Sequence, residues 1–198
     1  HETKAAAMIL GKRRGEKERN YLISLLDTSS TPLRDYLIET LSTNYPGDVE
    51  VFLERIESPN SPPMMKENLI LLLQKIKKIP QQGRLKEVLR DLIRNYFELI
   101  LEQDWLKRNN LDHSLMQEIN ERKKTQIRIM ILELLEIFLH QRVVVSIEKA
   151  LLTKNPRLIS NAMELFENIW DKTQAKSLIT LLYPQDFEEE LKIGKKFF

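Results

Sequence analysis

The stretch NPRLISNAMELFENIWD, residues 155–171, has the local signals of a single α-helix. Asn155 is a favoured N-cap residue, because its side-chain oxygen accepts a backbone N–H of the first turn. Pro156 suits the first helical position, where its missing N–H is not needed. Apolar residues then fall on two adjacent stripes, namely Leu158, Ala162, Leu165 and Ile169, and beside them Ile159, Met163, Phe166 and Trp170. One partner helix would not cover both stripes, so we expect neighbours on two sides.

The composition predicts a globular, all-α protein. Hydrophobic residues make up 42% of the 198 residues and charged residues 30%, which is typical of a folded chain. The 8 Pro residues lie between apolar segments rather than inside them, as helix boundaries do. The only brief candidate for a strand is VVV at 143–145.

Several classes of protein are disfavoured by simple counts. The chain has no cysteine, which excludes disulfides and thiolate metal sites and is compatible with a reducing compartment. The net charge of 31 − 29 = +2 does not favour general nucleic-acid binding. The longest apolar segment, 129–139, contains two Glu and is shorter than the roughly 20 residues that span a bilayer. Because His1 is not an initiator methionine, we expect a fragment of a longer protein. We also expect a cytoplasmic location, which includes the cytoplasmic side of a membrane protein.

A short pattern recurs along the chain at a nearly constant interval. In each copy an apolar residue is followed eight positions later by Leu or Phe, ending at Leu41, Leu73, Leu135 and Phe166, and Leu10 ends a similar N-terminal segment. The intervals between these anchors are 31, 32, 62 and 31 residues. A second helix follows each opening helix, which predicts five helix pairs. The pairs cover approximately 1–28, 31–57, 63–109, 114–153 and 155–183, with elongated central helices at 83–109 and 114–140.

The sequence from Asn155-Pro156 through Ala162, Glu164 and Phe166 resembles a HEAT-type repeat, as does Ala5-Ala6-Ala7 leading to Leu10-Gly11. This resemblance implies an α-solenoid of about five antiparallel helix pairs over 1–183, followed by a charged tail or linker at 184–198. It also implies a curved inner surface, lined by the second helices, that binds proteins, peptides or occasionally nucleic acid. The elongated central helices, and Ile159 in place of the usual basic residue, depart from the family pattern.

Residues 118–183 are also loosely similar to helical-repeat regions attached to bacterial ATP/ADP-translocase-type membrane carriers. This second resemblance implies that the chain is a soluble part of a larger, membrane-associated transporter protein. The helical-repeat resemblance leads to a prediction of a non-catalytic scaffold or interaction domain with a protein or peptide partner. The alternative is a nucleic-acid-binding helical repeat of the DNA-glycosylase type, in which Trp105 and Trp170, each beside an Asp, are candidates for base stacking. For Trp170 we favour core packing, because it continues an apolar stripe.

No catalytic motif is recognisable. The five glycines form neither a P-loop nor a dinucleotide-binding pattern, and no two histidines share a helical face. Glu133, Glu136 and His140 fall on one edge of a long helix, but a carboxylate-bridged metal centre would need a second such helix. We therefore predict neither an enzyme nor a bound cofactor or metal.

The candidate binding residues are Lys86, Arg90 and Arg94, which recur every four residues and line one face of a helix. Residues 75–94, including Lys77 and Lys78, hold seven basic and two acidic residues. One interpretation is a solvated face balanced by Glu87 and Asp91. The other is an anion-binding stripe for an acidic peptide, a phosphate group or an anionic membrane surface.

Overall fold

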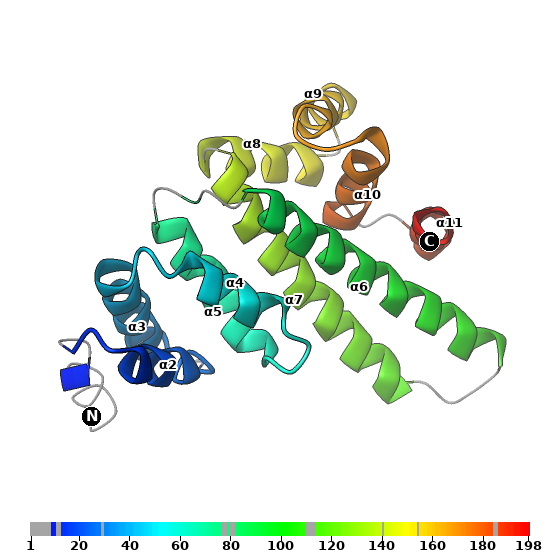
Figure 1. Ribbon diagram of the computed structural model, residues 1–198. Helices are drawn as coiled ribbons and strands as arrows, with labels where there is room; N and C mark the ends of the chain where they lie inside the picture. Colours follow the sequence, from blue (N-terminus) through cyan, green and yellow to red (C-terminus); the bar gives the residue numbers. More distant parts are fainter. Residues whose placement is uncertain are drawn as a thin grey trace. The chain divides into compact units, whose positions relative to one another are not determined.

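The computed structural model describes residues 9–10, 13–28, 30–76, 79, 82–109, 114–139, 141–153, 155–183 and 186–198, with only the backbone at Leu151. These residues form ten α-helices, labelled α2 to α11 in Figure 1, and contain no strand. The prediction of an all-α protein is therefore confirmed for this part of the chain. The chain divides into two compact units, residues 1–88 and 89–198, and the division falls within α6.

The first unit contains α2 (Glu16–Ser24), α3 (Thr31–Asn44), α4 (Val49–Glu57), α5 (Pro63–Lys75) and the beginning of α6 (Gln82–Arg108). Helix α3 packs on α2 and α5, and α4 packs on α5. The buried side-chain amide of Asn68 in α5 donates to the backbone carbonyls of Leu26 (2.6 Å) and Thr28 (3.3 Å). These bonds attach α5 to the segment that follows α2.

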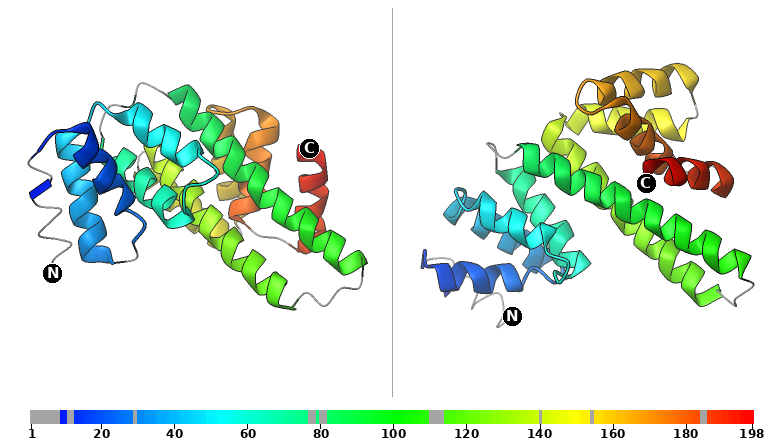
Figure 2. Two further views of the ribbon diagram at one scale, coloured as in Figure 1. Left: turned by 60° about the horizontal axis from the view of Figure 1, so that its bottom comes forward. Right: turned by 45° about the vertical axis from the view of Figure 1, so that its right-hand side comes forward.

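The second unit contains the rest of α6, α7 (Ser114–Phe138), α8 (Gln141–Leu152), α9 (Pro156–Glu167), α10 (Lys172–Leu182) and α11 (Phe187–Phe197). Each helix from α7 to α10 packs on the next one along the chain. Helices α6 and α7 lie side by side in Figures 1 and 2 and are joined by side-chain hydrogen bonds between Gln103 and Glu121 and between Asn120 and Glu102, both 3.3 Å. The elongated helices predicted at 83–109 and 114–140 correspond to α6 and α7.

The helix starts follow the predicted local chemistry most clearly at α9. The side-chain oxygen of Asn155 accepts from the backbone N–H groups of Arg157 (3.1 Å) and Leu158 (3.4 Å), and Pro156 is the first helical residue. Asp171 caps α10 and Asp186 caps α11 in the same way, with bonds of 2.9 Å. The predicted start of the helix at 155 is thus confirmed.

The predicted anchors Leu41, Leu73, Leu135 and Phe166 are all fully buried, as expected. Three of them also occupy the same position in their helices. Leu41, Leu73 and Phe166 each lie ten residues after the first residue of their helix (41 − 31, 73 − 63 and 166 − 156), and each of these helices begins with a Pro in its first two positions. The repeated spacing in the sequence therefore places a buried residue at the same position in each of these three helices.

Helix α9 differs from the expectation that both of its apolar stripes are covered. Ala162, Phe166 and Trp170 are buried, but the side chains of Leu158 and Leu165 are 40% and 38% exposed. The reason is that α9 packs on its chain neighbours α8 and α10, which leaves its other side uncovered. The stripe that contains Phe166 and Trp170 faces the core, whereas on the other stripe Ala162 is buried and Leu158 and Leu165 are partly solvent-accessible.

The segment 184–198, expected to be a charged tail or linker, requires a correction. Residues 187–197 form α11, whose residues Leu191, Ile193 and Gly194 are buried and which packs on α10. Its acidic first turn and basic last turn complement the helix dipole, which favours a helix over an extended linker. The folded unit therefore continues to the last helix.

Candidate functional site

A cavity of about 650 Å³ lies between α10 and α11 of the second unit. Four lysines from the two helices line it, together with two glutamates, a threonine, a serine and two apolar residues. The lining residues are Lys172, Thr173, Lys176, Ser177, Glu188, Glu189, Lys192, Ile193, Lys196 and Phe197. We call this cavity the lysine cleft. Its volume falls within the range of about 300–1,000 Å³ that is usual for ligand pockets.

The four lysines are arranged as two pairs, each with a spacing of four residues. Lys172 and Lys176 lie one turn apart on α10, and Lys192 and Lys196 lie one turn apart on α11. All four side chains are exposed, and none makes an ion pair with a carboxylate of the described residues. With Glu188 and Glu189 also in the lining, the formal charge of the cleft is 4 − 2 = +2.

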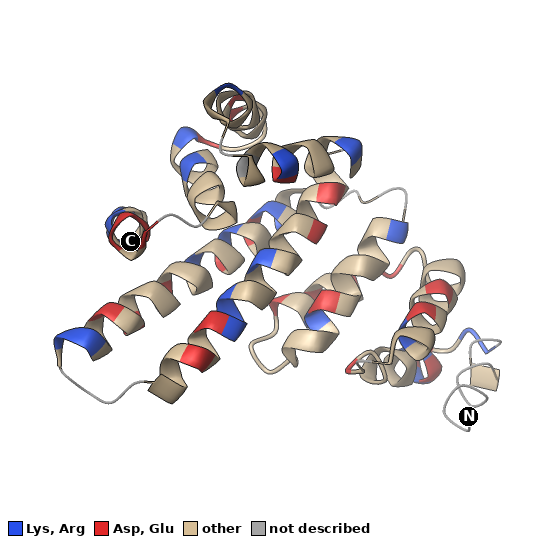
Figure 3. Ribbon diagram, turned by 180° about the vertical axis from the view of Figure 1, so that it is seen from behind, with Lys and Arg blue, Asp and Glu red and all other residues tan. Residues whose placement is uncertain are grey.

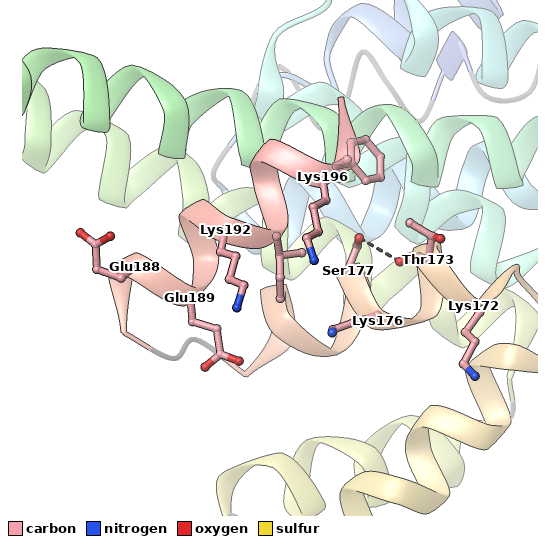
Figure 4. Close-up of a pocket in the computed structure, with 10 residues that line it drawn as sticks. Lys172, Thr173, Lys176, Ser177, Glu188, Glu189, Lys192 and Lys196 are labelled. Atoms are coloured by element: carbon pink, nitrogen blue, oxygen red, sulfur yellow. Dashed lines mark hydrogen bonds between the residues drawn. The ribbon is translucent and has the colours of Figure 1, made fainter.

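Figure 4 shows how these side chains are oriented. Lys176 from α10 and Lys192 and Lys196 from α11 extend into the space between the two helices, whereas Glu188 points away from it. The hydroxyl of Ser177, which is buried at the back of the cleft, donates to the backbone carbonyl of Thr173 (3.0 Å). The cleft thus presents ammonium groups from two helices, with the buried residues Ser177 and Ile193 also in its lining.

Close packing against α6 positions the helix that forms one wall of the cleft. Gly194 in α11 faces Phe97, and a Cβ atom at position 194 would lie 3.1 Å from the Phe97 ring. Two residues later, Lys196 points to the opposite side, into the cleft. Phe197 also contacts the ring of Phe97, with centroids 5.6 Å apart. The small residue lets α11 approach α6 closely, which orients Lys192 and Lys196 towards α10.

A buried polar cluster joins four helices beneath the cleft. Arg128 of α7 donates to the backbone carbonyl of Leu181 in α10 (2.9 Å), hydrogen-bonds to Tyr96 of α6, and lies 3.5 Å from the carboxylate of Glu190 in α11. Burial, together with the nearby carboxylate of Glu190, raises the pKa of Tyr96, although the positive charge of Arg128 opposes this shift. The cluster holds α10 and α11 in a defined relation, so it supports both walls of the cleft.

The predicted basic stripe lies on α6, as expected from its spacing, and its three residues already make interactions within the protein. Arg94 forms an ion pair of 2.8 Å with Asp91, and Lys86 and Arg90 are half-buried side chains that also make polar interactions. Lys77 and Lys78 lie outside the described residues. Figure 3 shows basic and acidic residues interspersed along the long helices. An anion-binding role for Lys86, Arg90 and Arg94 stays a prediction.

In the part of the chain that it describes, the structure does not show a metal site at the residues that the sequence offered as possible ligands. Glu133 and Glu136 are half-buried on α7, where burial and the carboxylate of Glu148 raise the pKa of Glu136, and His140 lies outside the described residues. Among the residues described, no three His, Cys, Asp or Glu side chains gather in a way that would hold a metal ion.

The two tryptophans have different environments. Trp170 is 7% exposed and makes edge contacts with Phe138 and Phe166, so it belongs to the core, as favoured from the sequence. Trp105 is 58% exposed, and the neighbouring Asp104 pairs with Arg108 (2.9 Å) and Lys195 (3.7 Å). The described residues therefore do not place the two tryptophans in one base-binding pocket.

The sequence does not predict the lysine cleft, because a charged tail or linker is expected at 184–198. Two signals for it were nevertheless present. Asp186 precedes an acidic turn as an N-cap does, and the pairs 172/176 and 192/196 both have the four-residue spacing of one helical face. What could not be read from the sequence is that the two pairs face one cavity.

No helix in the described part of the chain has the length and apolarity that crossing a membrane requires. Comparison of the chain with protein-family models, with curated proteins and with solved structures finds no match.

Proposed function

We propose that the chain is a non-catalytic, HEAT-like helical-repeat interaction domain that binds an anionic segment of a partner protein in the lysine cleft. The observation that carries the proposal is the convergence of lysines from α10 and α11 on one cavity without ion-pair partners among the described carboxylates. Like charges held together without counterions repel, which disfavours the folded state unless a ligand compensates them. Such an arrangement is typical of a binding site.

The packing order supports a repeat architecture. The contacts between α6 and α7 join residue pairs 96/128 and 103/121, as in antiparallel helices. From α7 to α11, consecutive helices pack on each other, which is the nearest-neighbour pattern of a solenoid. Two sets of contacts depart from this pattern. Arg128 of α7 bonds to Leu181 of α10, and α11 contacts both α6 and α7. We interpret α11 as a terminal helix that closes the last repeat.

The position of the cleft agrees with this proposal. In the predicted pairs, α10 is a second helix, and the second helices of such repeats line the surface that binds partners. Lys172 and Lys176 lie on that helix. We further propose, from the resemblance to regions attached to carrier proteins, that the chain belongs to a larger transporter protein and lies in the cytoplasm, which the full-length reading frame and its localisation would test.

Because binding would rely on electrostatic attraction, we can predict its approximate strength and its dependence on salt. Exposed ion pairs contribute only about 0.2–1 kcal/mol each, so several lysines must act together. Charges on the surface are screened over about 8 Å at physiological ionic strength, so affinity should fall as salt is added. We therefore expect weak, salt-sensitive binding that depends on the number of negative charges in the ligand.

The experiment compares two triple variants with the same change in charge. One replaces Lys176, Lys192 and Lys196 of the cleft with Ser, and the other replaces the exposed lysines Lys17, Lys123 and Lys149, which lie outside the cleft. Binding of a fluorescent oligo-glutamate peptide is measured by anisotropy over a range of salt concentrations. We expect a loss of at least about tenfold in affinity for the cleft variant and little change for the control.

Equal losses in both variants would indicate a general charge effect and contradict the proposal. Duplex DNA is tested in parallel, because lysines also attract the nucleic-acid backbone. Cleft-dependent DNA binding that is tighter than peptide binding, and that has a steep dependence on salt, would favour the alternative function of nucleic-acid recognition.

A further inference from the structure

We infer that the lysine cleft recognises a phosphate group carried by the partner segment, rather than a run of carboxylates. This inference rests on the proposed function and specifies its ligand. It starts from the three side chains of Lys176, Lys192 and Lys196, which extend from two helices into a common space. Each ammonium group offers three hydrogen-bond donors and one full positive charge.

The charge of the cleft matches a phosphate better than it matches a single carboxylate. A phosphorylated side chain carries about −1.5 to −2 charges at neutral pH and three strong acceptor oxygens. A carboxylate carries one charge and two oxygens, and would leave two of the three lysines uncompensated. The formal charge of +2 over the whole lining is close to that of one phosphate dianion with opposite sign.

The type of cation is compatible with a phosphate ligand. Among the described residues, the cations that line the cleft are all lysines. Arginine binds carboxylates and phosphates with two parallel hydrogen bonds, whereas lysine binds phosphate as a point charge that can approach from any direction. Ammonium groups that come from α10 on one side and α11 on the other suit the tetrahedral distribution of phosphate oxygens.

The floor of the cleft is partly apolar and leaves room for a side chain. Ile193 is buried, Phe197 is half-buried, and the buried hydroxyl of Ser177 is already engaged with Thr173. The apolar part of the wall can pack against the side chain that carries the phosphate. The volume of about 650 Å³ exceeds the need of a phosphate alone, so it admits the residue that carries the group and its neighbours.

The surroundings favour a protein segment as the source of the phosphate. The exposed residues Glu188 and Glu189 belong to the first turn of α11, beside the lysines. An extended anionic surface, such as a lipid headgroup layer or a nucleic-acid duplex, would meet these carboxylates together with the lysines. A single phosphorylated residue that enters the cavity can instead bind next to the lysines, and Glu188 points away from that space.

The test uses the complete chain and three short peptides that are identical except for a central phosphoserine, glutamate or serine. Binding is followed by NMR through the amide resonances of α10 and α11, so that the site is identified as well as the affinity. We expect the phosphopeptide to bind at least about tenfold more tightly than the glutamate peptide, and the serine peptide not to bind. The cleft triple variant should lose this binding, and the triple variant of Lys17, Lys123 and Lys149 should keep it.

The pH dependence of binding distinguishes a phosphate ligand from a carboxylate ligand without any substitution in the protein. The second pKa of a phosphoserine is about 6, so its binding should weaken as the pH falls from about 7.5 to 5.5. Free lysine side chains have a pKa of about 10.4 and glutamate about 4.3, so neither changes charge in this interval. Binding of the glutamate peptide should therefore stay constant between these two values.

Each contrary result has a distinct meaning. Equal affinity for the phosphoserine and glutamate peptides would overturn the phosphate inference and leave the proposed function in place. If no peptide binds, and the oligo-glutamate peptide also fails, both proposals are wrong. Vesicles containing phosphatidylserine that bind in a cleft-dependent manner, more tightly than the phosphopeptide, would overturn the assignment to a protein segment.

Discussion

The hydroxyl of Tyr96 donates a 2.8 Å hydrogen bond to the carboxylate of Glu190, which joins α6 to α11 across 94 residues of sequence. Both side chains are buried, and the guanidinium of Arg128 lies 3.5 Å from the same carboxylate. A buried carboxylate needs such partners, because its desolvation is otherwise strongly unfavourable. The pair therefore attaches the helix that carries half of the lysine cleft.

Replacing Tyr96 with Phe should lower the free energy of unfolding by about 1–3 kcal/mol, because Glu190 would lose a buried hydrogen-bond donor. Urea unfolding followed by circular dichroism measures this change. Tyr21→Phe is the control, since Tyr21 is exposed and a similar substitution there removes no buried bond. Equal effects of the two substitutions would contradict the role of the cluster.

The stabilising effect of Tyr96, measured by comparison with the Tyr96→Phe variant, should depend on pH in the alkaline range. Burial raises the pKa of Tyr96 above that of the unfolded chain, so the folded state keeps the phenol proton when the unfolded state has released it. The contribution of Tyr96 to stability is thus fully present below about pH 10 and is lost as the pH rises above that value. The stability difference between the wild type and Tyr96→Phe should be constant below about pH 10 and should shrink as the pH rises from about 10 to 11. A difference that stays constant over this interval would show that the phenol does not titrate as proposed.

Phe166→Ala should destabilise the second unit by about 3–5 kcal/mol, because it removes a large, fully buried side chain and leaves a cavity. The neighbouring Leu165→Ala is a matched control on the same helix, since Leu165 is 38% exposed. We expect the control to cost much less. Chemical denaturation of both variants measures the contrast, and similar losses would mean that the repeat anchor has no special position in the core.

The basic stripe of α6 has its own test. The triple change of Lys86, Arg90 and Arg94 to Ser is compared with the wild type in thermal midpoint and in binding to acidic peptides and anionic vesicles. Because Arg94 already pairs with Asp91, we expect the stripe to bind anions less strongly than the lysine cleft. Binding that is lost at unchanged stability would instead identify the stripe as an anion-binding surface.

Electrostatic repulsion among the lysines of the cleft should lower the free energy of unfolding, so replacing some of them should raise it. Replacing Lys172 and Lys176 with Gln removes two cations one turn apart at the start of α10, where the helix dipole disfavours positive charge. We expect a gain of about 0.3–1 kcal/mol that declines with added salt. The matched pair, Lys192 and Lys196, lies towards the end of α11, where the dipole favours cations, so its replacement should give a smaller gain or a loss. A loss of stability at both sites would indicate that the lysines are compensated in the folded protein.

Much of the helical architecture was predictable because its causes are local. Asn155 and Pro156 define the start of α9 through hydrogen bonds and a backbone angle that involve only the next few residues. The burial of Leu41, Leu73, Leu135 and Phe166 followed from a spacing that recurs along the chain. Helical periodicity is a property of consecutive residues, so it can be read without knowing how the helices pack.

Tertiary packing decided which of the apolar stripes is core and which charged residues share a site. The sequence of α9 offers two similar stripes, and only its contacts with α8 and α10 determine that Phe166 is buried while Leu158 remains partly exposed. Similarly, the residues 187–197 carry a helix signal, but the attachment of α11 depends on Tyr96 and Arg128, which lie far away in sequence. The lysine cleft is thus a product of contacts between distant segments. Local propensity determines where a helix begins, whereas the burial of apolar surface between helices determines which side chains meet.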